Sequence, residues 1–371
     1  MKIVMIVNNL PPKVDGVGDY TWHLAKELEL NDYEVHIICS KNEVFAKKKF
    51  HNVYPIVSQW NRKGINLTIK KIQEIQPNFV SLQYVPYGYN KYGLPFTLVF
   101  LAKYLSKQKT RLITTFHEVH NRFSPQPKLA IIYFGQKIIS YYLSKYSNSI
   151  VTSIEHYKNL LGKWGQKTTL IPVGSNIPPI QDIDKNYLNR IIKKIAPYQE
   201  FIISTFGVRD ISRLLFVFRE LKKEFKDIKL LVCGKTNYSH YNTSKGVIFT
   251  DYLEGPELFA HLKISNLFVI MDYVSPNGEG GTCNKSGALA AAYAAGLPII
   301  GMKGDMNNSL LKNRNNILFT DYNDSEELKN SITSVIRNPS LRKELAANSF
   351  CFYNEHLRWD RICNQYQALL H

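Results

Sequence analysis

The chain has 371 residues, more than one ordinary domain core contains, and this length indicates two domains. Its hydrophobic content of 44% and its charged content of 21% exclude a largely disordered, collagen-like or coiled-coil protein. The net charge of +17 is unusual and is concentrated in the first half, where residues 36–180 contain 20 Lys and Arg against four Glu. Such a positive field would attract phosphates, acidic glycans or anionic lipid. The alternative interpretation is that these lysines form an ordinary solvated surface.

No apolar run in the sequence approaches the roughly 20 residues that a membrane-spanning helix needs. The opening residues, MKIVMIV, are more typical of a first strand than of a secretory signal, so we expect a cytoplasmic protein. The five cysteines are widely separated and form no CxxC pair, which argues against a disulfide framework and a zinc site. Most of them are expected to be buried thiols.

Strand-like and helix-like patterns alternate along the first half of the chain. A strand-like run at residues 2–7 precedes a glycine turn and a helical pattern at residues 20–28. Further strand-like runs occur at residues 34–39, 79–84, 111–116, 149–152 and 168–172. Such alternation predicts parallel strands joined by crossover helices, so we expect a doubly wound, Rossmann-like α/β domain over residues 1–180.

A second alternating series follows a turn-rich segment after Pro172. Its strand-like runs lie at residues 201–206, 229–233, 247–250, 267–271, 298–301 and 317–319. They predict a second Rossmann-like domain over residues 181–350. The last segment, residues 351–371, is expected to be a helix that crosses back to brace the first domain.

Two glycines, Gly16 and Gly18, separate the first strand from the first helix. A GxG turn lets a ligand's phosphate approach the backbone, and the helix amino end adds partial positive charge. The third glycine of a dinucleotide fingerprint is absent, which weakens a nicotinamide or flavin interpretation. A simple tight turn is the alternative.

The segment GEGGTCNKSG precedes the helical run at residues 288–295. It would gather backbone amides, a lysine and a hydroxyl at one helix amino end, a combination suited to a diphosphate. The residues involved are Gly280, Gly281, Lys285, Ser286 and Gly287. The segment is not a Walker A loop, and ordinary helix capping is the alternative explanation.

Polar residues also follow two other predicted strands. His117 stands at a strand's carboxyl end, where open α/β sheets bind ligands, unless it is a hydrogen-bonded core histidine. The second domain's first strand is followed by Gly207, Arg209 and Arg213. Arginines at this position can offset the negative charge of a leaving diphosphate. The alternative is that they are ordinary surface residues. His117 and His120 could form a metal pair, but no further ligand stands at a convincing spacing and no DxD triad occurs, so we expect no metal.

Together these segments resemble the GT-B-fold glycosyltransferases of glycosyltransferase family 4. The resemblance is carried by DGVGDYTWHLAKEL, LQYVPYGY, TFHEVH, LIPVGSNIP and NKSGALAAAYAAGLP, and it covers nearly the whole chain. It implies two Rossmann-like domains facing a cleft and a retaining enzyme. The second domain would bind a sugar nucleotide and the first an acceptor.

The resemblance also implies roles for single residues. Gly16 and Gly18 would lie near the donor phosphates, and His117 near the transferred sugar. The diphosphate would be neutralised by Arg209 and Arg213 and would lie above the helix start formed by Lys285, Ser286 and Gly287.

One departure from the family pattern concerns the donor ribose. The usual EGFGxxxxE motif is absent, because Ala291 stands where the second glutamate would hold the ribose. Glu279 is the candidate for the first glutamate. Ribose recognition must therefore come from elsewhere.

The expected function is transfer of a sugar from a nucleotide diphosphate sugar to a glycan, lipid-linked or other envelope acceptor. We expect this transfer to need neither a metal nor a separate cofactor, and the enzyme to be peripheral at the inner membrane face. Three alternatives stay open: glycosyl transfer to nucleic acid, a GT-B-fold sugar-nucleotide epimerase, and an inactive sugar-nucleotide-binding homologue.

Overall fold

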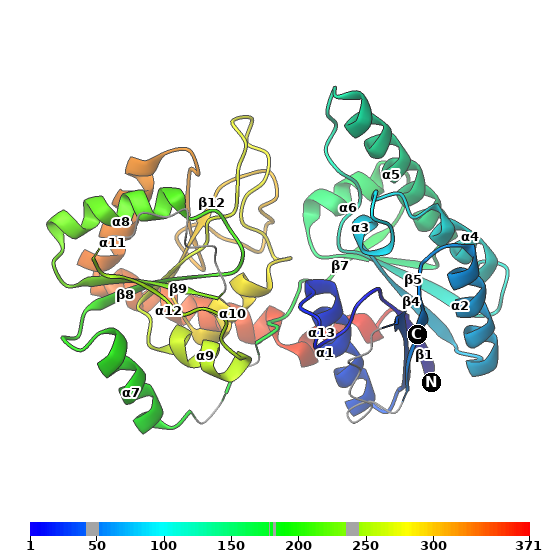
Figure 1. Ribbon diagram of the computed structural model, residues 1–371, viewed down its shortest axis with the longest axis horizontal. Coiled ribbons are helices and arrows are strands. Elements are labelled where there is room, and N and C mark those ends of the chain that lie inside the picture. Colours follow the sequence, from blue (N-terminus) through cyan, green and yellow to red (C-terminus); the bar gives the residue numbers. More distant parts are fainter. Residues whose placement is uncertain (42–51, 178, 181–182, 235–244) are drawn as a thin grey trace. The chain divides into compact units, whose positions relative to one another are not determined.

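The computed structural model describes residues 1–41, 52–177, 179–180, 183–234 and 245–371 (Figure 1). The chain folds into two compact units, one of residues 1–172 with 359–371 and the other of residues 173–358. Each unit contains one parallel sheet with helices on its faces. The predicted pair of doubly wound α/β domains is therefore confirmed.

The first unit has a seven-stranded sheet in the order β3-β2-β1-β4-β5-β6-β7. Its strands are β1 (Lys2–Ile6), β2 (Glu34–Ser40), β3 (Val53–Val57), β4 (Phe79–Tyr84), β5 (Arg111–Phe116), β6 (Ser149–Thr152) and β7 (Thr168–Leu170). Its helices are α1 (Gly16–Leu30), α2 (Arg62–Ile75), α3 (Pro86–Tyr89), α4 (Phe96–Leu105), α5 (Pro127–Tyr146), α6 (Glu155–Gly162) and the terminal α13 (Trp359–Gln367). All six residues of β4 are buried, as expected for a central parallel strand covered on both faces.

The second unit has a six-stranded sheet in the order β10-β9-β8-β11-β12-β13. Its strands are β8 (Phe201–Phe206), β9 (Ile228–Cys233), β10 (Val247–Phe249), β11 (Leu267–Val269), β12 (Ile299–Met302) and β13 (Leu318–Thr320). Its helices are α7 (Lys185–Ile195), α8 (Ser212–Glu224), α9 (Gly255–Lys263), α10 (Gly287–Ala295), α11 (Ser325–Arg337) and α12 (Pro339–Phe352), followed by a π-helical turn, Tyr353–Leu357. The sheet has a core on each face, one with α8 and α11 and one with α9 and α10 (Figure 1).

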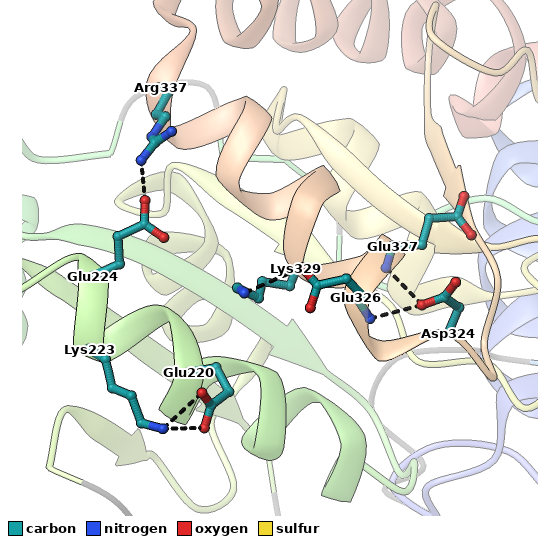
Figure 2. Close-up of polar contacts among 8 residues, drawn as sticks. All are labelled: Glu220, Lys223, Glu224, Asp324, Glu326, Glu327, Lys329 and Arg337. Carbon is teal, nitrogen blue, oxygen red and sulfur yellow. Dashed lines mark hydrogen bonds and ion pairs between the residues drawn. The ribbon is translucent and has the colours of Figure 1, made fainter.

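Helices α8 and α11 are joined by polar contacts as well as by their apolar residues. Arg337 on α11 forms an ion pair with Glu224 on α8 (Figure 2). The start of α11 is fixed by Asp324, whose Oδ1 accepts hydrogen bonds at 2.9 Å from the backbone amides of Glu326 and Glu327. This capping also fixes the loop between β13 and α11, which contributes to the site below.

The unit boundaries differ from the predicted limits at residues 180 and 350. Val173 already belongs to the second unit, because its amide donates to the carbonyl of Asn284 at 3.0 Å. At the other end, Tyr353 and Leu357 are buried in the second unit's core, so only the residues from Trp359 onward return. The returning helix α13 packs on α1, where the Trp359 ring stacks on His23 at 5.0 Å between centroids.

None of the described helices combines the length and the apolarity needed to cross a bilayer. All five cysteines are free thiols, and only Cys351 is exposed, as the sequence predicted for most of them.

Candidate functional site

Several residues of the second unit that could bind a ligand lie in the loops that follow its parallel strands. Gly207 and Arg209 follow β8, Asp272 follows β11, and Ser286 precedes α10. Loops at the carboxyl ends of such a sheet form the ligand-binding edge of doubly wound folds.

Arg209 connects three of these elements. Its Nε donates to Asp272 Oδ1 at 2.7 Å, its Nη1 to the Phe206 carbonyl at 3.0 Å, and its Nη2 to Ser286 Oγ at 3.0 Å. The structure therefore brings the two predicted residues Arg209 and Ser286 together. It also shows that the charge of Arg209 is partly neutralised by an acidic partner.

Sequence reasoning missed Asp272. The available signal was an acidic residue directly after the apolar run LFVIM. Its Oδ1 binds Arg209, while its Oδ2 is buried without a hydrogen-bond partner among the described residues.

Gly207 allows the guanidinium of Arg209 to fold back over the strand end. Its φ of +99° favours glycine, and a Cβ at this position would clash with Arg209 Nη1. Gly207 therefore supports the site by shaping this turn.

The start of α10 offers groups that can bind an anion. Ser286 is the N-cap, and its Oγ accepts a hydrogen bond from the amide of Leu289 at 3.2 Å. In the described part of the chain, the amides of Gly287 and Ala288 have no acceptor. Two amides and the positive end of the helix dipole thus remain for an anion.

Lys285 stands directly before this cap and is half-buried. Burial raises the pKa of the neighbouring Cys283 thiol to about 11, and the positive charges of Lys285 and Arg209 work against this rise. Both cations therefore act on the same small region at the start of α10.

The amides of Gly280 and Gly281 were expected to bind a phosphate, but in the structure both have other partners. The amide of Gly280 donates to Asp305 Oδ1 at 2.8 Å, and the amide of Gly281 donates to the Tyr273 carbonyl at 3.1 Å. Their φ values of +116° and +96°, together with close backbone neighbours, require glycine at both positions. These glycines hold the loop together, and the predicted anion site narrows to the start of α10.

Glu279 belongs to the same loop and is half-buried. Its carbonyl accepts from the amide of Ser275 at 2.9 Å, and its own amide donates to Ser275 Oγ at 3.2 Å. These contacts fix the backbone of Glu279 but assign no role to its carboxylate.

Arg213 lies on the first turn of α8 and has partners from another loop. Its Nη1 donates to the Asn323 carbonyl at 3.1 Å and to Ser325 Oγ at 3.2 Å. Its guanidinium also lies 5.3 Å from the ring centroid of Tyr322. Arg213 therefore ties α8 to the first residue of α11 and to the loop before it through three neutral groups.

His117 lies at the carboxyl end of β5 in the first unit, where the sequence predicted it. Its Nε2 is 2.9 Å from Gln83 Oε1, and its ring meets the ring of Tyr20 edge-on at 5.0 Å between centroids. The side chain is half-buried. Gln83 was missed by sequence analysis, although a glutamine inside an otherwise apolar strand was a usable signal.

Gly16 and Gly18 begin α1 but have different surroundings. Asp15 caps the helix, and its Oδ1 accepts from the amides of Val17 at 3.0 Å and Gly18 at 2.9 Å. The amide of Gly18 is thus occupied, and a Cβ there would lie 2.6 Å from the Asn9 carbonyl oxygen. Only Gly16 has open space around its α-carbon, so a ligand could approach the backbone there.

No group of three or more His, Cys, Asp or Glu side chains that could hold a metal occurs among the residues the structure describes.

Comparison with known proteins adds a family match and a fold. Residues 202–350 match the family model described as "Glycosyl transferases group 1". An uncharacterized glycosyltransferase of Methanocaldococcus jannaschii is 23% identical over 409 aligned residues, covering 100% of this chain and 98% of the relative.

Solved structures resemble the whole chain at low identity. Sucrose-phosphate synthase from Thermosynechococcus elongatus superposes with a TM-score of 0.73 at 15% identity, covering 100% of this chain and 98% of that one. HepE of Anabaena in complex with UDP gives 0.74 at 12% identity, with coverages of 100% and 99%. WaaG, a glycosyltransferase involved in lipopolysaccharide biosynthesis, gives 0.66 at 11% identity, with coverages of 99% and 98%. These likenesses show that the two Rossmann-like units have the GT-B fold.

Proposed function

We propose that this chain is a retaining glycosyltransferase of family 4 that uses a nucleotide diphosphate sugar as donor. The observation that carries the proposal is the start of α10, where two unoccupied amides, Lys285 and the Arg209–Ser286 contact lie together. This edge lies within residues 202–350, the part that matches the group 1 glycosyltransferase model.

The same groups suggest how the donor is activated. The amides of Gly287 and Ala288 would bind a diphosphate oxygen, and Lys285 would stabilise the charge that develops as the sugar leaves. Arg209 would act mainly by holding Ser286 and the helix start in place, because Asp272 already binds its Nε. The departing phosphate would then take the acceptor proton on the same face, which gives retention.

Uridine nucleotides are the first donors to test. The structures of HepE are complexes with UDP, with UDP and glucose, and with UDP-glucose, and that of S. aureus MnaA is a complex with UDP. A thermal-shift panel of UDP, GDP, ADP and dTDP sugars would identify the donor, since a ligand that binds only the native state raises the unfolding temperature.

Turnover assays separate the proposal from its rivals. Incubation of the stabilising donor with separate pools of lipid, glycan and DNA acceptors should give a glycosylated product that retains the donor's anomeric configuration. Conversion of the donor to an isomer without any acceptor would indicate an epimerase. Donor binding without turnover in any pool would indicate an inactive homologue, and an inverted product would contradict retention.

Metal independence is part of the proposal, because amides and side-chain cations can meet the leaving-group charge. We expect full activity in excess EDTA. Loss of activity in EDTA that is restored by magnesium or manganese would show that a divalent cation takes part.

The acceptor side of the proposal rests on the surface of α4 and α5, which pack together in the first unit (Figure 1). Large apolar side chains are exposed there, including Phe100 at 68%, Ile131 at 67%, Phe134 at 53% and Ile138 at 49%. No acidic residue occurs between Val119 and Ile154. Along the chain, the basic residues within or beside these two helices include Lys103, Lys107, Arg122, Lys128, Lys137 and Lys145.

Exposed apolar residues interleaved with lysines suit an anionic membrane surface, where both kinds of side chain contribute. We therefore propose peripheral association with the inner membrane face and a lipid-linked or other envelope acceptor. Nucleic acid is the competing acceptor, because it would also bind a basic surface.

A further inference from the structure

The buried strand β4 contains two polar side chains on the same face. Ser81 and Gln83 are both fully buried, and they are two residues apart, so their side chains point the same way. Burying an amide and a hydroxyl is costly unless both are hydrogen-bonded. The Gln83 Nε2 donates to Ser81 Oγ at 2.7 Å, which satisfies part of this need.

The terminal helix α13 completes this contact. Tyr366 is fully buried, and its hydroxyl donates to the same Ser81 oxygen at 2.6 Å. The two residues are 285 positions apart in the sequence. The helix that returns to the first unit thus places a hydroxyl beneath the centre of its sheet.

The other end of the Gln83 amide reaches His117. Because the amide nitrogen of Gln83 binds Ser81, its oxygen faces His117 Nε2, at 2.9 Å. An amide oxygen can only accept a hydrogen bond, so the network assigns the imidazole proton to Nε2. Nδ1 of the neutral ring then carries the lone pair.

We propose that Gln83 is a positioning residue for His117, and that Tyr366 supports it by holding the Ser81 oxygen in place. Together they fix the orientation and the tautomer of the imidazole, with the proton on the nitrogen that faces Gln83. This inference rests on the proposed function and on the role that the resemblance to family 4 implies for His117, a place near the transferred sugar.

The first test measures the tautomer directly. Protein labelled with ¹⁵N-histidine would be studied by long-range proton–nitrogen NMR at about pH 8, and the His117 signals would be identified by their loss in His117→Gln. We expect a neutral ring with the proton on Nε2 in the wild type. A ring protonated on Nδ1, or on both nitrogens, would overturn the inference whether or not the protein is active.

The second test compares three variants of buried glutamines. Gln83→Met removes the acceptor at similar size, and Gln83→Glu keeps an oxygen acceptor. Gln136→Met is the matched control, because Gln136 is also fully buried but accepts from the backbone amide of Asn121 at 2.7 Å. UDP release from UDP-glucose measures turnover.

We expect Gln83→Met to mix the two tautomers of His117 and to lower kcat about tenfold with little change in KM, the usual scale for loss of an outer partner. Gln83→Glu should restore the Nε2 proton and most of kcat. Gln136→Met should lower the unfolding temperature but leave the His117 signals and kcat unchanged. Tyr366→Phe should shift the signals in the same direction as Gln83→Met, to a smaller extent.

Unchanged His117 signals in Gln83→Met, or equal changes in Gln136→Met, would contradict the role of Gln83. Unchanged signals in Tyr366→Phe would remove Tyr366 from the proposal. If the wild type does not turn over UDP-glucose, the proposed function fails for this donor, while the NMR comparison still decides on the positioning role.

Discussion

Arg209 lies at a predicted ligand site but has a carboxylate partner, and this changes what its removal would do. The Arg209 and Asp272 side chains are only 16% and 21% exposed. Arg209→Ala would leave a largely buried carboxylate without its cation, so we expect a loss of about 2 kcal/mol or more in the free energy of unfolding. Urea unfolding measures this loss.

The double variant Arg209→Ala with Asp272→Ala provides the control. It should be more stable than the sum of the two single losses predicts, because no unpaired charge remains. Additive losses would show that the ion pair does not stabilise the loop.

Lys285 differs from Arg209 because it is predicted to act on the ligand. Lys285→Ala should lower turnover about 10²–10³-fold while leaving the fold intact, because it removes one preorganised positive charge from the helix start. Lys343→Ala changes an exposed lysine on α12 and controls for the change in net charge.

Arg213→Ala should also lower turnover, but it will cost stability because the contacts of Arg213 with Asn323 and Ser325 are lost. Unchanged turnover in both Lys285→Ala and Arg213→Ala would refute the phosphate assignment.

The positions of these residues could be predicted from the sequence, but their partners could not. A strand followed by a glycine and an arginine places Arg209 at the sheet edge, and a serine before an alanine-rich run places Ser286 at a helix cap. The contact of Gly280 with Asp305 spans 25 residues, and that of His117 with Gln83 spans 34. Such pairings depend on how the loops and strands are arranged in three dimensions, which a local pattern does not contain.

At the scale of elements, α1 shows that two neighbouring glycines can serve different purposes. Gly18→Ala should destabilise the protein, because its Cβ would lie 2.6 Å from the Asn9 carbonyl oxygen and the loop before α1 would have to move. Gly16→Ala should leave the unfolding temperature unchanged or slightly higher, since open space surrounds its α-carbon.

Donor affinity then shows whether Gly16 faces a ligand. If the donor phosphates approach this turn, Gly16→Ala should weaken donor binding about tenfold or more without a loss of stability. Calorimetric titration with the donor measures this change. Wild-type affinity in Gly16→Ala would place the donor elsewhere.

The elements that sequence analysis missed have identifiable causes. Strand β3 contains Pro55, which removes a ladder donor and obscures the strand pattern, and it lies at the edge of its sheet, where proline is tolerated. The end of the second unit was placed too early because the helical pattern continues through the π-helical turn without a clear stop. The break comes only at Arg358, whose φ and ψ of −67° and 143° are extended.

At the scale of the whole molecule, the charge excess of the first unit makes a prediction about where the protein works. The lysines at positions 128, 137 and 145 lie on α5 beside the exposed Ile131, Phe134 and Ile138. Each Lys near an anionic leaflet contributes about 1 kcal/mol. The full chain should therefore sediment with vesicles of phosphatidylglycerol and phosphatidylcholine, and less with phosphatidylcholine alone or at high salt.

Variants of α5 separate the two contributions to this binding. Replacing the three lysines by Gln should weaken binding to the anionic vesicles about 100-fold, which corresponds to about 3 kcal/mol. Ile131→Ser with Phe134→Ser should weaken binding at every salt concentration, because the lost contribution is apolar. Phe216→Ser on α8 is the matched control, since Phe216 is 53% exposed in the second unit.

A parallel DNA-binding assay decides between a membrane-linked acceptor and a nucleic-acid acceptor. Tight DNA binding without vesicle binding would favour nucleic acid. Binding to neither would mean that the lysines are only solvated.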